Sequence, residues 1–172
     1  MVAQQLRLGL WMRYWAGLRL APHVGTPSHV GKRMLQLASV GPHDHVVDLG
    51  CGDGRLLIAA AKLYGAKCYG VELDPQLFEE AQRAVAQEGM GHLINIERRD
   101  AFSVDLSKAS VVTLYLSVKG NSRLLPMLQQ QLPSGARVVS FCWPFEALEP
   151  AHITQVDGIN LYLYKFNGGN AS

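Results

Sequence analysis

The first 43 residues of the chain contain no aspartate or glutamate. Five basic residues give this part a formal charge of +5, whereas residues 44–172 hold 11 basic and 14 acidic residues and carry −3. Such polarity predicts that the beginning of the chain meets a membrane surface, an organelle import system or an acidic partner. The near-neutral remainder is typical of an enzyme body and argues against a nucleic-acid ligand.

Cysteine is also scarce. Cys51, Cys68 and Cys142 are the whole complement, and no two of them form a Cys-x-x-Cys pair. We therefore expect reduced thiols and no zinc or other metal site. His43 and His45 flank Asp44 just before the first expected strand, and we interpret them as solvated polar residues in preference to metal ligands.

No hydrophobic run near the start is long enough to span a bilayer. Residues 6–20 mix three arginines with leucines and aromatic residues. Three interpretations stay open: a helix on an anionic membrane surface, a mitochondrial-type transit segment, and a helix packed on the domain. We accordingly divide the chain into an N-terminal basic amphipathic segment (1–21), a folded domain (22–167) and a frayed tail (168–172).

The length of 172 residues, with 48% hydrophobic and 17% charged residues, fits one domain with its own core. Strand-like and helix-like segments alternate along it. The expected strands are 46–49, 67–72, 93–97, 111–116, 137–142, 153–156 and 159–166. The expected helices are 29–39 with Ser28 as N-cap, 55–64, 75–88 with Asp74 as N-cap, and 121–131. This alternation predicts an α/β fold with a doubly wound parallel sheet.

The most informative stretch is residues 46–55, Val-Val-Asp-Leu-Gly-Cys-Gly-Asp-Gly-Arg. It predicts a buried strand, a glycine-rich turn and the start of a helix, an arrangement that brings backbone N–H groups and a positive helix end close to a ligand. The dinucleotide fingerprint would need a third glycine where Arg55 stands. Asp48 repels a pyrophosphate but suits the α-ammonium group of an amino acid.

Two more carboxylates follow neighbouring strands. Glu72 ends the second strand, where an acid can accept hydrogen bonds from both hydroxyls of a ribose. Asp100 follows the third strand, where it can accept from an exocyclic amine while a neighbouring backbone N–H, such as that of Ala101, donates to a ring nitrogen. A surface ion pair of Asp100 with Arg98 or Arg99 is the alternative.

The run Asp48 to Gly54 resembles motif I of the class I S-adenosylmethionine (SAM) methyltransferases, and residues 71–74, Val-Glu-Leu-Asp, resemble their motif II. This resemblance implies a Rossmann-like, seven-stranded sheet whose last strand is antiparallel. It also implies SAM as the cofactor. The residues expected to bind it are Asp48, Gly50, Cys51, Gly52, Gly54, Glu72, Leu73, Asp100 and Ala101.

Residues 24–30, 48–55 and 111–117 together resemble a narrower family, the small protein-lysine methyltransferases that act on mitochondrial ATP synthase c-subunit and the adenine nucleotide translocase, with short prokaryotic relatives. The first segment in that family usually reads Tyr-x-Pro-Thr-Pro, and residues 23–27 here read His-Val-Gly-Thr-Pro. The resemblance implies a protein lysine as methyl acceptor. It implies a cytoplasmic enzyme in a prokaryote and a mitochondrial one in a eukaryote. Association of residues 1–20 with an anionic membrane is one of the three interpretations of their basic amphipathic pattern.

The acceptor side is less well marked. The Asn/Asp-Pro-Pro-Tyr tetrad of many amino- and nucleobase-directed methyltransferases is absent after the fourth strand, where the chain reads Tyr115-Leu-Ser117. On the resemblance, we expect Tyr115, Ser117 and Thr26 near the reacting methyl group. Tyr115 as a core aromatic residue is the alternative, because the strand register is not fixed. A small-molecule or nucleic-acid methyltransferase and a non-catalytic SAM-binding module remain competing functions.

Overall fold

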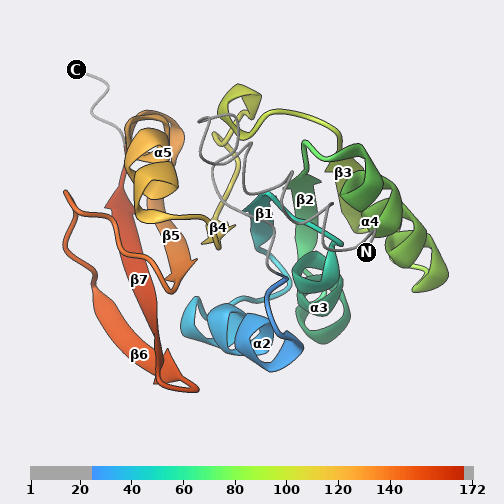
Figure 1. Ribbon diagram of the computed structural model, residues 1–172, viewed down its shortest axis with the longest axis horizontal. Coiled ribbons are helices and arrows are strands. Elements are labelled where there is room, and N and C mark those ends of the chain that lie inside the picture. The colour runs from blue at the N-terminus through green and yellow to red at the C-terminus, as the bar shows by residue number, and fades with distance from the viewer. Residues whose placement is uncertain (1–24, 169–172) are drawn as a thin grey trace, which may run out of the picture.

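A computed structural model describes residues 25–168 and contains a seven-stranded sheet with helices on both faces (Figure 1). The predictions for residues 1–21 and for residues 169–172 lie outside this range. The strand order is β3-β2-β1-β4-β5-β7-β6. The strands are β1 (His45–Leu49), β2 (Lys67–Val71), β3 (Ile94–Glu97), β4 (Val111–Leu114), β5 (Ser134–Phe141), β6 (His152–Val156) and β7 (Ile159–Asn167).

Strands β1 to β5 pair in parallel, and β7 runs antiparallel to both β5 and β6. The central strands are nearly continuous apolar runs because helices or loops cover both of their faces; every residue of β4 is buried. The doubly wound α/β sheet with an antiparallel last strand is thereby confirmed. The order reverses between β1 and β4, so a ligand is expected at the carboxyl ends of these two strands.

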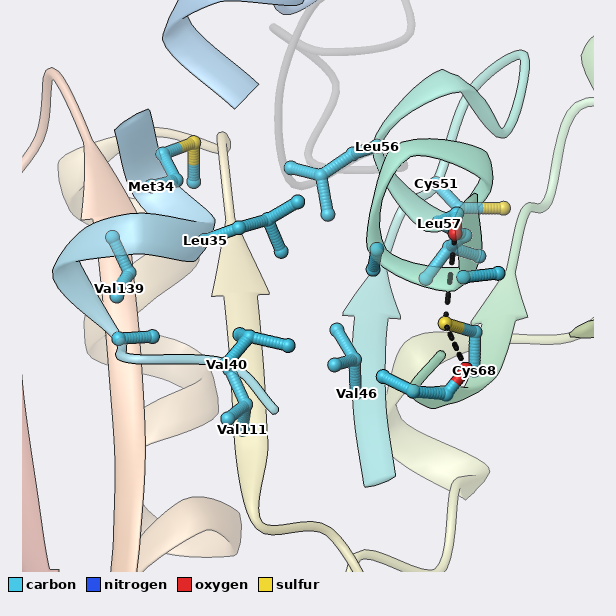
Figure 2. Packing of buried hydrophobic residues seen from close by; sticks show 14 of the residues in the cluster. Met34, Leu35, Val40, Val46, Cys51, Leu56, Leu57, Cys68, Val111 and Val139 are labelled. Atoms are coloured by element: carbon cyan, nitrogen blue, oxygen red, sulfur yellow. Dashed lines mark hydrogen bonds between the residues drawn. The ribbon is translucent and has the colours of Figure 1, made fainter. Parts of the chain in front are cut away.

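The helices divide between the two faces of the sheet. Helices α2 (Ser28–Leu37), α3 (Arg55–Tyr64) and α4 (Pro75–Gln87) cover one face, and α5 (Val118–Gln131) covers the other together with residues 98–110. Figure 2 shows the core on the face that α2, α3 and α4 cover. There, Met34 and Leu35 of α2 and Leu57 of α3 pack over the strand residues Val46 and Val111. The sheet therefore lies between two separate apolar cores.

Asp74 and Ser28 are the two residues expected as helix N-caps. Asp74 is the N-cap of α4, and its carboxylate accepts from the N–H groups of Gln76 and Leu77, as predicted. Ser28 was wrongly predicted as an N-cap: the first helical hydrogen bond runs from Gly31 N–H to the Pro27 carbonyl, so Ser28 already lies inside the first turn of α2.

The fourth strand and the helix after it also differ from the prediction. Strand β4 ends at Leu114 because Ser117 caps α5, which begins at Val118, three residues earlier than expected. Pro126 lies within α5. Between residues 25 and 168, no helix has the length and apolar character needed to cross a membrane.

Candidate active site

The glycine-rich turn connects β1 to α3 at the carboxyl edge of the sheet. Gly50, Gly52 and Gly54 have φ values of 98°, 55° and 78°, the left-handed region that side chains other than glycine rarely adopt. The N–H groups of Gly50 and Cys51 donate to the Val71 carbonyl at 2.9 and 3.0 Å, which ties the turn to the end of β2. The turn is thus a fixed loop at the N-terminus of a helix.

Asp48 is a buried carboxylate directly beneath this turn. It is 8% exposed, and burial raises its pKa to about 7, helped by the negative charges of Glu72 and Asp53 and opposed by a hydrogen bond from Thr113. None of the ion pairs formed among residues 25–168 involves Asp48. A buried acid of this kind is stabilised as an anion when a cation is placed beside it.

Glu72 follows β2 and faces the same turn. One of its carboxylate oxygens accepts from Gly52 N–H at 3.0 Å, and the other accepts from the N–H groups of Leu73 and Asp74, each at 2.9 Å. Three backbone donors therefore hold the carboxylate in one orientation. A carboxylate offers about four acceptor positions, so a further donor from a ligand hydroxyl can still be accommodated.

Asp100, Ala101 and Phe102 form the third part of the carboxyl edge, after β3. The Asp100 carboxylate caps a short 3-10 helix (Ala101–Ser103) by accepting from Phe102 N–H at 3.0 Å. The Arg99 guanidinium pairs with Glu97 at 3.3 Å, and no ion pair with Asp100 forms within the described residues. Asp100 stays exposed, whereas Ala101 is buried and Phe102 half-buried.

Cys51 and Leu73 differ in what their side chains do. The Cys51 thiol is buried in the core below α3, and this burial raises its pKa. Because the side chain is buried, Cys51 can meet a ligand at the turn only through its backbone. Leu73 is 49% exposed, directly after Glu72. An exposed apolar side chain at this position can cover one face of a bound aromatic ring.

Arg55, which the sequence reasoning did not single out, connects the turn to the segment that carries Thr26. Its guanidinium pairs with Asp53 and also donates to the Thr26 carbonyl at 3.4 Å. Thr26 thus lies beside the first residue of α3, on the same edge of the sheet as the glycine-rich turn. The Asp-x-Arg spacing of residues 53 and 55 indicates their ion pair, whereas no local pattern indicates the contact of Arg55 with Thr26.

Tyr115 and Ser117 lie at the end of β4, as expected from the sequence. Tyr115 is half-buried on the α2 face of the sheet, with its ring 4.5 Å from that of Phe141 at an angle of 53°. Burial raises the pKa of its phenol. Ser117 is the N-cap of α5 and accepts from Gly120 N–H at 3.0 Å, so its oxygen has a structural role.

Gly70 and Asn121 were also missed. A Cβ atom built on Gly70 would lie 2.5 Å from Leu57 Cδ1 and 2.9 Å from Cys51 Sγ, so β2 and α3 approach too closely for any side chain at this position. A lone glycine within an expected strand is a signal for such an approach. No sequence pattern marked Asn121 as a functional residue. The pattern predicts that the helix begins at Asn121, whereas this residue lies within the first turn of α5 and is fully buried.

The arrangement fits SAM at three points. The buried Asp48 carboxylate, without a cationic partner in residues 25–168, suits the α-ammonium group of the methionine part. Glu72, oriented by three backbone donors, can still accept a hydrogen bond from a ribose hydroxyl. The region of Leu73, Asp100 and Ala101 would then meet the adenine ring.

The role of Glu72 gives a first prediction. Replacing Glu72 with alanine is expected to weaken binding of S-adenosylhomocysteine (SAH) by about 1 to 3 kcal/mol, because hydrogen bonds to a charged acceptor are lost. Isothermal titration calorimetry measures this change. Glu97→Ala is the matched control, since Glu97 ends the neighbouring strand β3 and pairs with an exposed arginine. Equal affinities of Glu72→Ala and Glu97→Ala for SAH would contradict the ribose assignment.

Comparison with known proteins agrees with this geometry. The ANTKMT methyltransferase domain family matches residues 48–152. A protein-lysine N-methyltransferase of Saccharolobus islandicus is 38% identical over 148 residues, which cover 83% of this chain and 92% of the relative. The adenine nucleotide translocase lysine N-methyltransferase of Mus musculus is 31% identical over 152 residues, 88% of this chain and 66% of the relative.

Among solved structures, an RNA methyltransferase from Salinibacter ruber in complex with SAH superposes with a TM-score of 0.82. It is 38% identical, and the match covers 84% of this chain and 94% of that protein. Its bound SAH agrees with the cofactor expected from the glycine-rich turn. The chain is therefore a SAM-dependent methyltransferase that belongs to the ANTKMT methyltransferase domain family.

Proposed function

We propose that this enzyme transfers the methyl group of SAM to the side-chain nitrogen of a protein lysine. The observation that carries the proposal is the 38% identity, over 83% of the chain and 92% of the relative, to a protein named as a lysine N-methyltransferase. The translocase-directed and ATP synthase-directed relatives are also named as lysine N-methyltransferases.

An RNA acceptor is the second candidate, because the Salinibacter ruber structure of equal identity is described as an RNA methyltransferase. The charge of this chain favours protein. Residues 44–172, which include the whole of the family match (48–152), carry a formal charge of −3. Binding to RNA depends on neutralising phosphates with lysine and arginine side chains, and a net acidic body is poorly suited to this.

Methyl transfer from SAM to a lysine amine requires mainly positioning by the protein. SAM supplies a methyl group activated by a sulfonium. A lysine must arrive without its proton and in line with that methyl group, so desolvation and orientation provide much of the rate. The half-buried Tyr115 ring, tilted against that of Phe141, gives the end of β4 an apolar wall that favours a neutral amine over a solvated ammonium.

The proposal is tested with SAM that carries a labelled methyl group. The enzyme is incubated with a whole-protein extract, with the same extract after chemical acetylation of its lysines, and with purified RNA. Label in the first sample that disappears after acetylation is the expected result. Label that enters RNA and not protein would replace this proposal with the second candidate.

Tyr115 and Thr26 provide a prediction about turnover. Tyr115→Ala and Thr26→Ala are expected to lower the rate of methyl transfer at least about tenfold while changing SAH affinity less than about twofold, because both residues lie on the acceptor side. Single-turnover rates and calorimetry separate the two effects. Tyr115→Phe keeps the ring on Phe141 and serves as the packing control. Normal turnover with reduced thermal stability in Tyr115→Ala would mean that the ring only packs the core.

A further inference from the structure

Strand β5 ends in a tight reversal of the chain. Cys142 has a φ of 70°, a left-handed conformation that is uncommon for a residue with a side chain. Trp143 N–H donates to the Phe141 carbonyl at 2.8 Å, and Cys142 N–H donates to the Asn160 carbonyl of β7 at 2.9 Å. The turn leaves the Trp143 side chain 42% exposed at the carboxyl edge of the sheet. Residues held in sparsely populated backbone conformations are often found at functional sites.

A buried side chain holds this turn from α5. Asn121 is completely buried, and its amide nitrogen donates to the Trp143 carbonyl at 2.8 Å and to Ser140 Oγ at 3.1 Å. Ser140 in turn donates to the same Trp143 carbonyl at 2.6 Å. Two donors therefore converge on one backbone oxygen. Within the described part of the chain the Asn121 amide oxygen has no partner, a cost that an apolar residue at this position would avoid.

The turn also lies beside the end of β4. Strands β4 and β5 are adjacent, with Leu114 opposite Ser140, and the ring of Tyr115 lies against that of Phe141. Leu116, next along the chain, would lie 3.6 Å from a Cβ built on Gly50 in the glycine-rich turn. The turn Cys142–Pro144 is therefore one strand away from the residues that border the cofactor turn.

We propose that the turn Cys142–Pro144 forms a wall of the acceptor site, that Trp143 contacts the incoming lysine side chain, and that Asn121 is the positioning residue that holds Trp143 in place. This inference rests on the proposed lysine acceptor. An indole face can pack along the lysine methylenes and attract an ammonium group by a cation–π interaction before its proton leaves. The amide of Asn121 binds the Trp143 backbone carbonyl and thereby fixes the turn from which the indole extends.

The position of Trp143 can be followed by its fluorescence. Trp11→Phe and Trp15→Phe leave it as the single tryptophan of the chain. In this background, with SAH bound, N-acetyl-lysine amide is added as the probe and N-acetyl-norleucine amide, which lacks the amine, as its control. We expect quenching by the lysine probe that is at least about twofold stronger than by the norleucine control, from the cation–π contribution.

Substitutions then separate contact from positioning. Asn121→Asp keeps the shape of the side chain but places an acceptor against the Trp143 carbonyl, so the response to the probe should disappear. Ser140→Ala removes one of the two donors and should reduce it. Trp143→Ala, a change at an exposed residue, should raise the apparent KM for protein extract about fivefold. In all three variants, SAH affinity should stay within about twofold of the parent enzyme.

The Trp143 contact, the positioning role of Asn121 and the lysine acceptor are each contradicted by a different result. An unchanged apparent KM in Trp143→Ala, in an enzyme that labels protein, overturns this inference and leaves the proposed function intact. Parallel losses of SAH affinity and thermal stability in Ser140→Ala, with the Trp143 response unchanged, would show that the Asn121 and Ser140 pair only stabilises the fold. Label in RNA alone would instead contradict the lysine acceptor itself.

Discussion

Replacing Gly70 with alanine is expected to lower the free energy of unfolding by about 1 to 3 kcal/mol, the usual cost of adding atoms to a filled core. The new methyl group would lie 2.5 Å from Leu57 Cδ1 and 3.0 Å from Cys51 Cβ. Leu57 is completely buried and cannot simply turn outward. Cys51 belongs to the glycine-rich turn, so its displacement should weaken SAH binding as well. Figure 2 shows Cys51 and Leu57 together above Cys68.

Urea denaturation gives the change in stability, and two further variants identify its cause. Gly91→Ala is the control, because nothing lies within 4 Å of a Cβ built there. In a double-mutant cycle, Leu57→Ala should cost less in the Gly70→Ala background than alone, since it removes the closest overlap. Equal stabilities of Gly70→Ala and Gly91→Ala would show that the helix moves aside without cost.

Gly70 also illustrates what the sequence could predict. The strands, their parallel order and the glycine-rich turn were predictable, because apolar runs and glycine spacing are local patterns. The ligand edge followed from topology, which brought Asp48, Glu72 and Asp100 to one side of the sheet. The lone Gly70 in an expected strand indicates that something approaches the backbone closely, but that the neighbour is Leu57 of α3 was not predictable, because it depends on the distance between two elements.

Errors at element boundaries have a similar origin. Ser28 matched the residue preference of an N-cap, but the helix began one residue earlier, where the Pro27 carbonyl accepts the first hydrogen bond. The pattern predicts a helix that begins at Asn121, whereas Ser117 provides the cap and Asn121 lies buried within the first turn. Its partners come from β5 (Ser140) and from the turn that follows this strand (Trp143). Contacts between distant segments of this kind leave no periodic signal in a single sequence.

Asp48 gives the prediction with the clearest dependence on pH. An unfolded aspartate titrates near 3.8, whereas the buried Asp48 carboxyl has a pKa of about 7. Between these two values the folded state binds more protons than the unfolded state, so the free energy of unfolding falls as the pH rises. The slope for this one group is at most about 1.4 kcal/mol per pH unit. Without ligand, Asp48→Asn should therefore match the wild type near pH 4 and become increasingly more stable than it up to about pH 7.

Binding of SAM or SAH should show the opposite preference. The α-ammonium group favours the ionised carboxylate, so the wild type should bind more tightly as the pH rises from 5 to 7, with proton release on binding. Calorimetry in buffers of different ionisation enthalpy measures the released proton. Asp48→Asn should bind about 10- to 100-fold more weakly at pH 8, where the charge-assisted hydrogen bond is lost, and should release no proton. Proton release by Asp48→Asn equal to that of the wild type would assign the titrating group elsewhere, and Asp48 would then not be the partner of the ammonium group.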